Sequence, residues 1–330
     1  MSTPTSDAGA AYVSTGSLPP PDRIRTLVDA AWTTFAPIAD GAVSRVYPAL
    51  ERMAPELFGL CLVGVSGASY AVGDADVPFS IMSVSKPFVL ALICEAIGPD
   101  AVRAKIGVNA TGMAFNSVAA IERRSDGRTN PMVNAGAIAT TSLVPGPDAD
   151  ARWERIHRGL SRFAGRDLAV NEEIYASASA TNFRNRSLAA MLQSLDAIYC
   201  DPAEALDLYT RQCALDVTAH DLAVMGATLA DGGVNPVTGE RVVAPEVCHD
   251  VLAVMATAGM YETSGDWLYE VGLPGKSGIG GGIVTVSPGK GALATFSPPL
   301  DAAGNSVRGQ LATRFLSRSL GLNLFASRPI

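Results

Sequence analysis

The chain of 330 residues is 48% hydrophobic and 17% charged, which allows one large domain, or two lobes around one cleft, with a well-buried core. A formal net charge of -7 and a pI near 5.0 argue against nucleic acid and anionic membranes as partners, because neither is attracted by a negative field. Five widely spaced cysteines without a C-x-x-C pair indicate neither a disulfide framework nor a zinc site, and they favour the reducing cytoplasm.

The N-terminal segment is predicted to be a disordered tail over residues 1–20, followed by a catalytic domain over residues 21–330. The tail is rich in Ser, Thr, Ala and Pro, and it has neither the basic start nor the apolar core of a secretion signal. The most apolar segment, residues 88–97, contains Glu95 and is too short to span a bilayer. We therefore expect a soluble, cytoplasmic protein that binds neither membrane nor nucleic acid.

The first predicted elements are helical and then extended. Apolar residues at helical spacing predict a helix over 21–35, and a second helix is expected around 43–53. The runs 58–65 and 69–72, separated by Ser66-Gly67-Ala68, predict a β-hairpin. A further helix is expected from about 84 to 97.

The middle of the chain, residues 130–229, is predicted to be a mostly helical lobe, with helices at 134–143, 149–163, 185–195, 202–213 and 218–229. After it, the glycine-rich KSGIGGGIVTVSPGKGALATFSP predicts two strands joined by a turn at 288–291, and a last helix is expected over 303–320. Strands near both ends with helices between them indicate an α+β fold, in which an antiparallel sheet is flanked by helices and interrupted by a helical lobe at about 130–230.

The motif Ser83-Val84-Ser85-Lys86 follows a strand-rich segment and opens an apolar helix. Residues three apart share a helix face, so the amine of Lys86 can reach the hydroxyl of Ser83. A lysine activates a serine only when its amine is uncharged. The start of the helix also offers a free backbone N–H to a developing oxyanion. Because Pro87 follows, the helix is expected to begin a residue or two after Ser83.

A second motif, Lys276-Ser277-Gly278, matches the K-[ST]-G of serine β-lactamases and penicillin-binding proteins. In such folds this strand lies beside the nucleophile, where Lys276 could be the second cation that keeps Lys86 uncharged. Another S-x-x-K copy, residues 287–290, falls in the predicted hairpin turn, and we interpret it as coincidence.

Five ordered strings of the chain resemble the glutaminase family over roughly residues 24–325. They are FSIMSVSKPF, NPMVNAGAIATTSL, LDLYTRQCALDVTAHDLAVMGATLADGGVNPVTGERVV, GMYETSGDWLYEVGLPGKSGIGGGI and FSPPLDAAGNSVRG. The resemblance implies a β-lactamase-like or penicillin-binding-protein-like fold and the hydrolysis of L-glutamine to L-glutamate and ammonia. It implies no metal or other cofactor, and a homodimer or homotetramer.

The resemblance also implies roles for single residues. Ser83 would attack the carboxamide with Lys86 as its base, forming a glutamyl ester, and Tyr261 would help transfer a proton to the departing ammonia. The residues implied to line the glutamine pocket are Tyr47, Asn134, Asn185, Tyr209 and Tyr261. The backbone N–H groups of Ser83 and Ile279 would form the oxyanion hole. The residues implied to support the site are Lys276, Ser277 and Gly278. Without the resemblance, Asn134 could equally be a helix N-cap. Tyr209 and Tyr261 could be ordinary core aromatics.

Two positions depart from the family pattern. Ala178 stands where the family has a carboxylate that pairs with the substrate's α-ammonium, and the loss of such a bond costs about 1.5–3 kcal/mol, or roughly ten- to hundredfold in affinity. Either Glu172 or Glu173 compensates, or the substrate differs. Met82 replaces a frequent Gln beside the nucleophile. The alternatives are another S-x-x-K acyl-transfer enzyme, such as a β-lactamase or peptidase, and a catalytically weakened binding protein.

Overall fold

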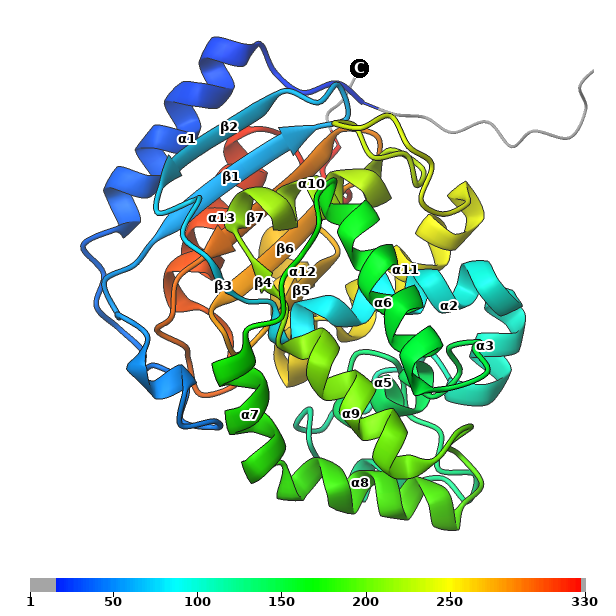
Figure 1. Cartoon of the computed structure of the whole chain (residues 1–330). Coiled ribbons are helices and arrows are strands. Elements are labelled where there is room, and N and C mark those ends of the chain that lie inside the picture. The colour runs from blue at the N-terminus through cyan, green and yellow to red at the C-terminus, as the bar shows by residue number, and fades with distance from the viewer. Residues whose placement is uncertain (1–15, 328–330) are drawn as a thin grey trace, which may run out of the picture.

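A five-stranded antiparallel sheet lies at the centre of the computed structural model, which describes residues 16–327 (Figure 1). Its strands, in the order β2-β1-β7-β6-β5, are β2 Ser69–Gly73, β1 Gly59–Gly64, β7 Gly291–Phe296, β6 Gly282–Ser287 and β5 Gly275–Ser277. Strand β1 pairs with β7 from Gly59 opposite Phe296 to Gly64 opposite Gly291, so the two ends of the chain meet inside the sheet. The α+β class with a helix-flanked antiparallel sheet is confirmed.

The side chains of β1 alternate between two apolar cores. Leu60 and Leu62 join the core under α1 (Pro21–Phe35) and α13 (Val307–Ser319), whereas Cys61 and Val63 join the core on the other face of the sheet. Figure 1 shows α1 and α13 on the outer face and α10 (Ala219–Ala230) crossing the inner face. This period of two is what a strand buried on both faces requires.

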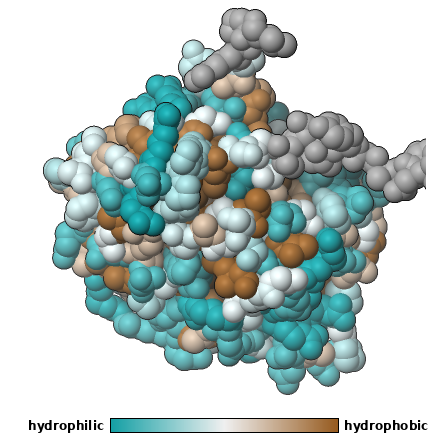
Figure 2. All heavy atoms as spheres, turned by 90° about the horizontal axis from the view of Figure 1, so that it is seen from above, coloured by the Kyte–Doolittle hydropathy of each residue, from teal (hydrophilic) through white to brown (hydrophobic). Residues whose placement is uncertain are grey.

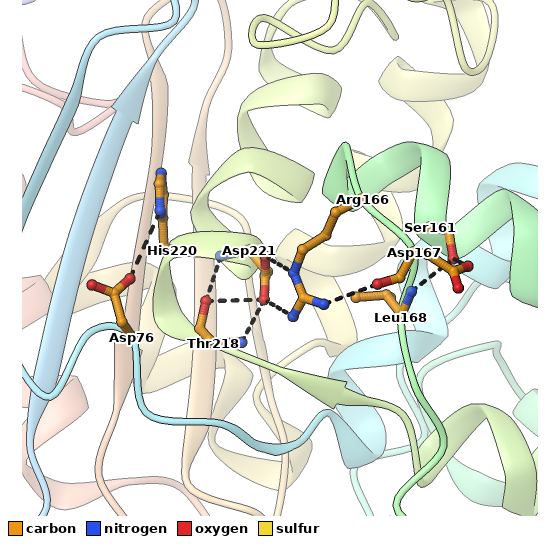
Figure 3. A network of polar contacts seen from close by, with 8 residues as sticks. All are labelled: Asp76, Ser161, Arg166, Asp167, Leu168, Thr218, His220 and Asp221. Atoms are coloured by element: carbon orange, nitrogen blue, oxygen red, sulfur yellow. Dashed lines mark hydrogen bonds and ion pairs between the residues drawn. The ribbon is translucent and has the colours of Figure 1, made fainter.

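Helix α10 packs closely on the sheet and is fixed at its start. At Gly226 an added Cβ would lie 2.7 Å from side-chain atoms of Ala292 and Val284, so only glycine allows this approach. Thr218 and Asp221 form a capping box, and Arg166 donates two bonds of 2.8 and 2.6 Å to the Asp221 carboxylate (Figure 3). Helix α10 falls within the helical lobe predicted at 130–230, yet it packs on the sheet. The division of the chain into a sheet lobe and a helical lobe stays a prediction.

The next helices lie on the inner face of the sheet or extend away from it (Figure 1). They are α2 Ser85–Ile97, α3 Pro99–Ile106, α4 Ala119–Glu122, α5 Asn134–Thr141, α6 Ala149–Ala164, α7 Glu172–Thr181, α8 Phe183–Ser194, α9 Pro202–Cys213 and α11 Pro245–Ala258. Helix α12 (Ser264–Val271) instead contributes Trp267 and Val271 to the core on the outer face. Three short 3-10 helices, η1 Leu50–Arg52, η2 Met82–Val84 and η3 Tyr261–Thr263, and a two-stranded pairing of β3 Phe79–Ser80 with β4 Asp216–Val217 complete the described chain. The sequence does not predict the helices α3, α4, α7, α11 and α12.

Three sequence predictions differ from the structure. The helix expected at 43–53 is reduced to η1, because Pro48 would lack a backbone hydrogen bond inside it. The last helix starts at Val307 rather than 303, since the Asp301 carboxylate accepts the N–H groups of residues 303–305 and holds them in a turn. The C-terminal strands number three rather than two, because a turn containing Gly281 at φ 93° separates β5 from β6.

In residues 16–327, no single helix is both long and apolar enough to cross a membrane. The helices Met82–Ile97 and Pro99–Ile106 are long and apolar enough only when they are taken together, and the chain bends by 119° between them. On the face drawn in Figure 2, apolar residues form small patches between polar ones, which is ordinary for a water-exposed surface. The predicted tail is described only over residues 16–20, which carry no regular structure, and its residues 1–15 lie outside the described range.

Candidate active site

Ser83 lies in a sharp turn between a strand and a helix. Strand β3 ends at Ser80, the N–H of Ile81 donates to Leu215 O at 2.9 Å, and Ser83 follows in η2 directly before α2. Met82 has φ 48°, a left-handed conformation that is uncommon for a residue with a side chain. Helix α2 starts at Ser85, as expected, so that Pro87 falls in its first turn, where no hydrogen bond is lost.

A cavity of about 170 Å³ opens beside Ser83. Six of the residues singled out from the sequence line it, namely Tyr47, Ser83, Asn134, Asn185, Tyr209 and Ile279. They come from η2, α5, α8, α9 and the segments before η1 and after β5, so the fold brings together residues from most of the chain. Both departures from the family pattern, Met82 and Ala178, also line this cavity.

Asn134 is the centre of a hydrogen-bond network in the cavity wall. Its Oδ1 accepts a bond of 2.7 Å from Lys86 Nζ and one of 3.2 Å from the hydroxyl of Tyr209, while its Nδ2 donates to Asn185 Oδ1 at 2.9 Å. The residue at the N-cap position of α5 is Val133, and Asn134 makes no capping bond. The alternative interpretation of Asn134 as a helix cap is therefore wrong.

The environment of Lys86 favours the uncharged form of its amine. Complete burial lowers the pKa of Lys86 from 10.5 to about 7. Its Nζ donates to Met132 O at 3.2 Å and to Asn134 Oδ1 at 2.7 Å. An uncharged amine has two N–H donors and one lone pair, so these two acceptors use both donors and leave the lone pair free.

The predicted direct contact between the amine of Lys86 and the hydroxyl of Ser83 is absent from the hydrogen bonds of residues 16–327, because the two oxygen acceptors hold the amine. Bonds between catalytic groups are often long before substrate binds.

Lys276 is fully buried and interacts electrostatically with Lys86, and its role as the second cation stays a prediction. Its Nζ donates to Gly259 O at 2.9 Å and to Ser277 O at 2.6 Å, and it lies 4.4 Å from the ring centroid of Tyr261. Burial, and then repulsion from Lys86, lower the pKa of Lys276 well below its usual value. Burial is the largest cause of the lowered pKa of both lysines, and repulsion between two charged amines acts on both of them alike.

Tyr261 lies directly beside Ser83. Its hydroxyl donates to Ser277 O at 3.2 Å, and a hydrogen bond with the Ser83 side chain partly offsets the burial that raises the pKa of Tyr261. Its ring packs against Phe115 at 4.8 Å, and its backbone, like that of Met82, has a positive φ, here 57°. Since the phenol stays protonated, it can donate or relay a proton but cannot be the base.

Two backbone N–H groups are free to form an oxyanion hole. In residues 16–327, the N–H groups of Ser83 and Ile279 donate to no backbone carbonyl. Strand β5 and the glycines after it pack against η2, and a Cβ added at Gly278 would lie 3.3 Å from Ser83 N and 3.1 Å from Ile81 O. This close approach holds the residue before Ile279 against Ser83, which is the arrangement that an oxyanion hole of two N–H groups requires.

Sequence reasoning missed several residues of the cavity wall, of which the most informative are Phe115, Asn116, Asn182, Arg184, Thr210 and Cys213. Asn182 Nδ2 donates to Thr210 Oγ1 at 3.1 Å, and Arg184 Nε donates to Asn116 O at 2.9 Å. Both Asn182 and Arg184 precede Asn185 in the string TNFRN, so the proximity of polar residues to a predicted site residue could have indicated them. Neither Glu172 nor Glu173 lines the cavity. Glu173 instead pairs with Arg52, and compensation for Ala178 by either residue is not supported.

Comparisons with known proteins agree with one another. The family profile described as Glutaminase matches residues 41–325. Glutaminase 2 of Yersinia pestis is 66% identical over 318 residues, covering 96% of this chain and 94% of that protein, and a glutaminase of Brucella canis is 50% identical over 307 residues, covering 93% and 97%. Among solved structures, the probable glutaminase ybaS has a TM-score of 0.92 at 44% identity, covering 94% of this chain and 100% of its own. Mglu in its glutamate form has a TM-score of 0.86 at 40% identity, covering 94% and 70%.

Proposed function

The chain belongs to the glutaminase family, with its β-lactamase-like fold, and hydrolyses L-glutamine to L-glutamate and ammonia; we propose that it does so through an acyl-enzyme on Ser83 with Lys86 as the base. The observation that carries this mechanism is the buried amine of Lys86, whose pKa is about 7 and whose two N–H groups are both engaged. Its lone pair is left to accept the proton of Ser83.

In the first half-reaction, Ser83 Oγ attacks the carboxamide carbon of glutamine while its proton passes to Lys86 Nζ. The charge that develops on the carboxamide oxygen is stabilised by the N–H groups of Ser83 and Ile279. The C–N bond then breaks, the leaving nitrogen takes a proton, and ammonia departs from the glutamyl ester on Ser83. Tyr261, whose phenol stays protonated beside Ser83, relays that proton from the Lys86 ammonium.

In the second half-reaction, a water molecule takes the place of ammonia. Lys86, uncharged again, accepts a proton from the water as its oxygen attacks the ester carbon. The tetrahedral intermediate collapses, the proton returns to Ser83, and glutamate leaves. Tyr47, Asn134, Asn185 and Tyr209 surround the rest of the substrate with neutral hydrogen-bonding groups.

The pH dependence of the reaction tests the role of Lys86. The base works only when it is uncharged, so kcat/KM for ammonia release should fall about tenfold per pH unit below about 7 and level off above it. The measurement is a coupled ammonia assay from pH 5.5 to 9.5, run in parallel with asparagine and a chromogenic β-lactam. A profile that stays flat through pH 7 would remove Lys86 as the base, and faster turnover of the β-lactam than of glutamine would favour a β-lactamase.

Gly278 packs closely against the turn that contains Ser83, and this packing leads to a second prediction. In Gly278→Ala the new Cβ would meet Val84 Cγ2 at 3.0 Å and Ile81 O at 3.1 Å, so the turn must shift by a few tenths of an ångström. We expect kcat to fall by about 10- to 100-fold, because catalytic groups tolerate little displacement. Gly265→Ala is the matched control, since its Cβ would meet nothing within 4 Å. Equal kcat in both variants would contradict the proposed oxyanion hole.

The cellular setting is also a proposal. All five cysteines, at positions 61, 94, 200, 213 and 248, are free thiols, which fits the reducing cytoplasm. A homodimer or homotetramer is proposed on the family resemblance alone. Light scattering of the purified protein would measure the assembly directly.

A further inference from the structure

The charges around the cavity are strongly unequal. Arg184 is the one cationic side chain that lines it, and no Asp or Glu does so among residues 16–327. Glutamine carries both an α-carboxylate and an α-ammonium. The cavity therefore offers a charged partner to the carboxylate and none to the ammonium.

The wall around Ala178 is neutral and already hydrogen-bonded. Ala178 is 3% exposed and presents a methyl group, and Asn182 lies one helical turn further along the chain. The Oδ1 of Asn182 accepts from the hydroxyl of Tyr47 at 3.5 Å, and its Nδ2 donates to Thr210. An ammonium in this region would lose water and gain only neutral acceptors that are partly in use.

Arg184 is placed to bind a carboxylate at the mouth of the cavity. Its Nε donates to Asn116 O, which fixes the guanidinium between α8 and the segment before α4. Among residues 16–327 its two terminal nitrogens bond to no protein acceptor, so both can donate to the two oxygens of one carboxylate.

We propose that the substrate class of this site is the terminal carboxamides of short dicarboxylic acids with a free carboxylate, whether or not they carry an α-amino group. This inference rests on the proposed function, which supplies the acyl transfer. Glutaramate, which is glutamine with hydrogen in place of the α-ammonium, keeps the carboxamide and the carboxylate and loses only the group that the cavity does not bind. It is therefore bound and hydrolysed at least as well as glutamine.

Ligand binding to the Ser83→Ala protein tests the inference without turnover. Calorimetric titration with glutaramate should give a Kd equal to or lower than that for glutamine. A Kd for glutaramate more than tenfold above that for glutamine, or no binding of either ligand, overturns the inference. If the unsubstituted protein releases no ammonia while glutaramate still binds as expected, the proposed function fails and the binding inference stands.

Restoring a negative charge should reverse the preference. Ala178→Glu is expected to raise the ratio of kcat/KM for glutamine to that for glutaramate by at least about tenfold, since a charge-assisted bond to the ammonium is gained. Ala180→Glu is the matched control, because Ala180 is exposed on the same helix and lies outside the cavity wall. An unchanged ratio in Ala178→Glu overturns the inference. If that variant does not fold, the titrations decide.

The carboxylate contact has its own pair of variants. Arg184→Gln should raise KM for both amides by about tenfold and leave their ratio unchanged, whereas Arg186→Gln, on the same helix but outside this cavity, should change neither. Equal KM values in the two variants would overturn the role of Arg184.

Discussion

Ser83→Ala is expected to abolish ammonia release from glutamine, lowering kcat by about 10⁴- to 10⁶-fold, as the loss of a nucleophile does in other serine hydrolases. Without the hydroxyl no ester can form, and nothing else in the described cavity wall takes its place beside Tyr261, Lys86 and the two free N–H groups. The cavity itself should persist, because only one oxygen is removed. The variant should therefore bind substrate while failing to turn it over.

The chain supplies its own control for this experiment. The second S-x-x-K copy, Ser287 to Lys290, lies at the β6–β7 turn, far along the chain from η2 and outside the cavity wall. Ser287→Ala should leave kcat unchanged. Turnover that survives in Ser83→Ala, measured with single-turnover ammonia release to exclude contamination, would discard the acyl-enzyme on Ser83.

Lys86→Met is expected to lower kcat by about 10²- to 10⁴-fold, the usual contribution of a positioned base, and to raise stability at the same time. The pKa of Lys86 is about 7 in the folded protein against 10.5 as its ordinary value, so the unfolded chain binds a proton more readily. At pH 7 this difference destabilises the folded state by an amount on the order of 4 kcal/mol. The free energy of the two hydrogen bonds that Lys86→Met removes must be subtracted from that amount. We expect the net effect to be a higher Tm at pH 7.

The pH dependence of that gain identifies its cause. Because the folded pKa of Lys86 is lowered, the cost of burying its amine grows as pH falls from 10.5 toward 7 and shrinks as pH rises. The stability advantage of Lys86→Met should therefore be smaller at pH 9 than at pH 7, as measured by denaturant unfolding. Lys290→Met, which removes an exposed amine, is the control and should show no such trend. An advantage that does not vary with pH would point to packing instead.

The elements of the fold that could be predicted are those set by residues next to them in the sequence. Helix α9 was predicted with its observed bounds, because Asp201 caps it and Pro202 occupies its first position, so both signals lie in the sequence next to the helix. The helix expected at 43–53 does not form in full, because Pro48 interrupts a segment whose apolar spacing alone favours a helix. The third strand was missed because the turn after Gly278 depends on contacts with Ser80 and Ser297, which are remote in the sequence.

The candidate site divides in the same way. The S-x-x-K and K-S-G motifs indicated Ser83, Lys86 and Lys276 because chemistry of this kind recurs at fixed spacing. How far burial lowers the pKa of each lysine could not be predicted, since the depth of each amine depends on the whole fold. Arg184, the one cation that lines the cavity among residues 16–327, acquires its place through the carbonyl of Asn116, a contact between distant segments that no local pattern encodes.

The pairing of residues 59–64 with residues 291–296 has a consequence for synthesis on the ribosome. The hairpin of β1 and β2 emerges early, and its free edge must wait until almost the whole chain has been translated before β7 can join it. During that interval Leu60, Leu62 and Val63 lack their final neighbours. Nascent chains stalled before β7 should therefore depend on chaperones, whereas the complete chain should not.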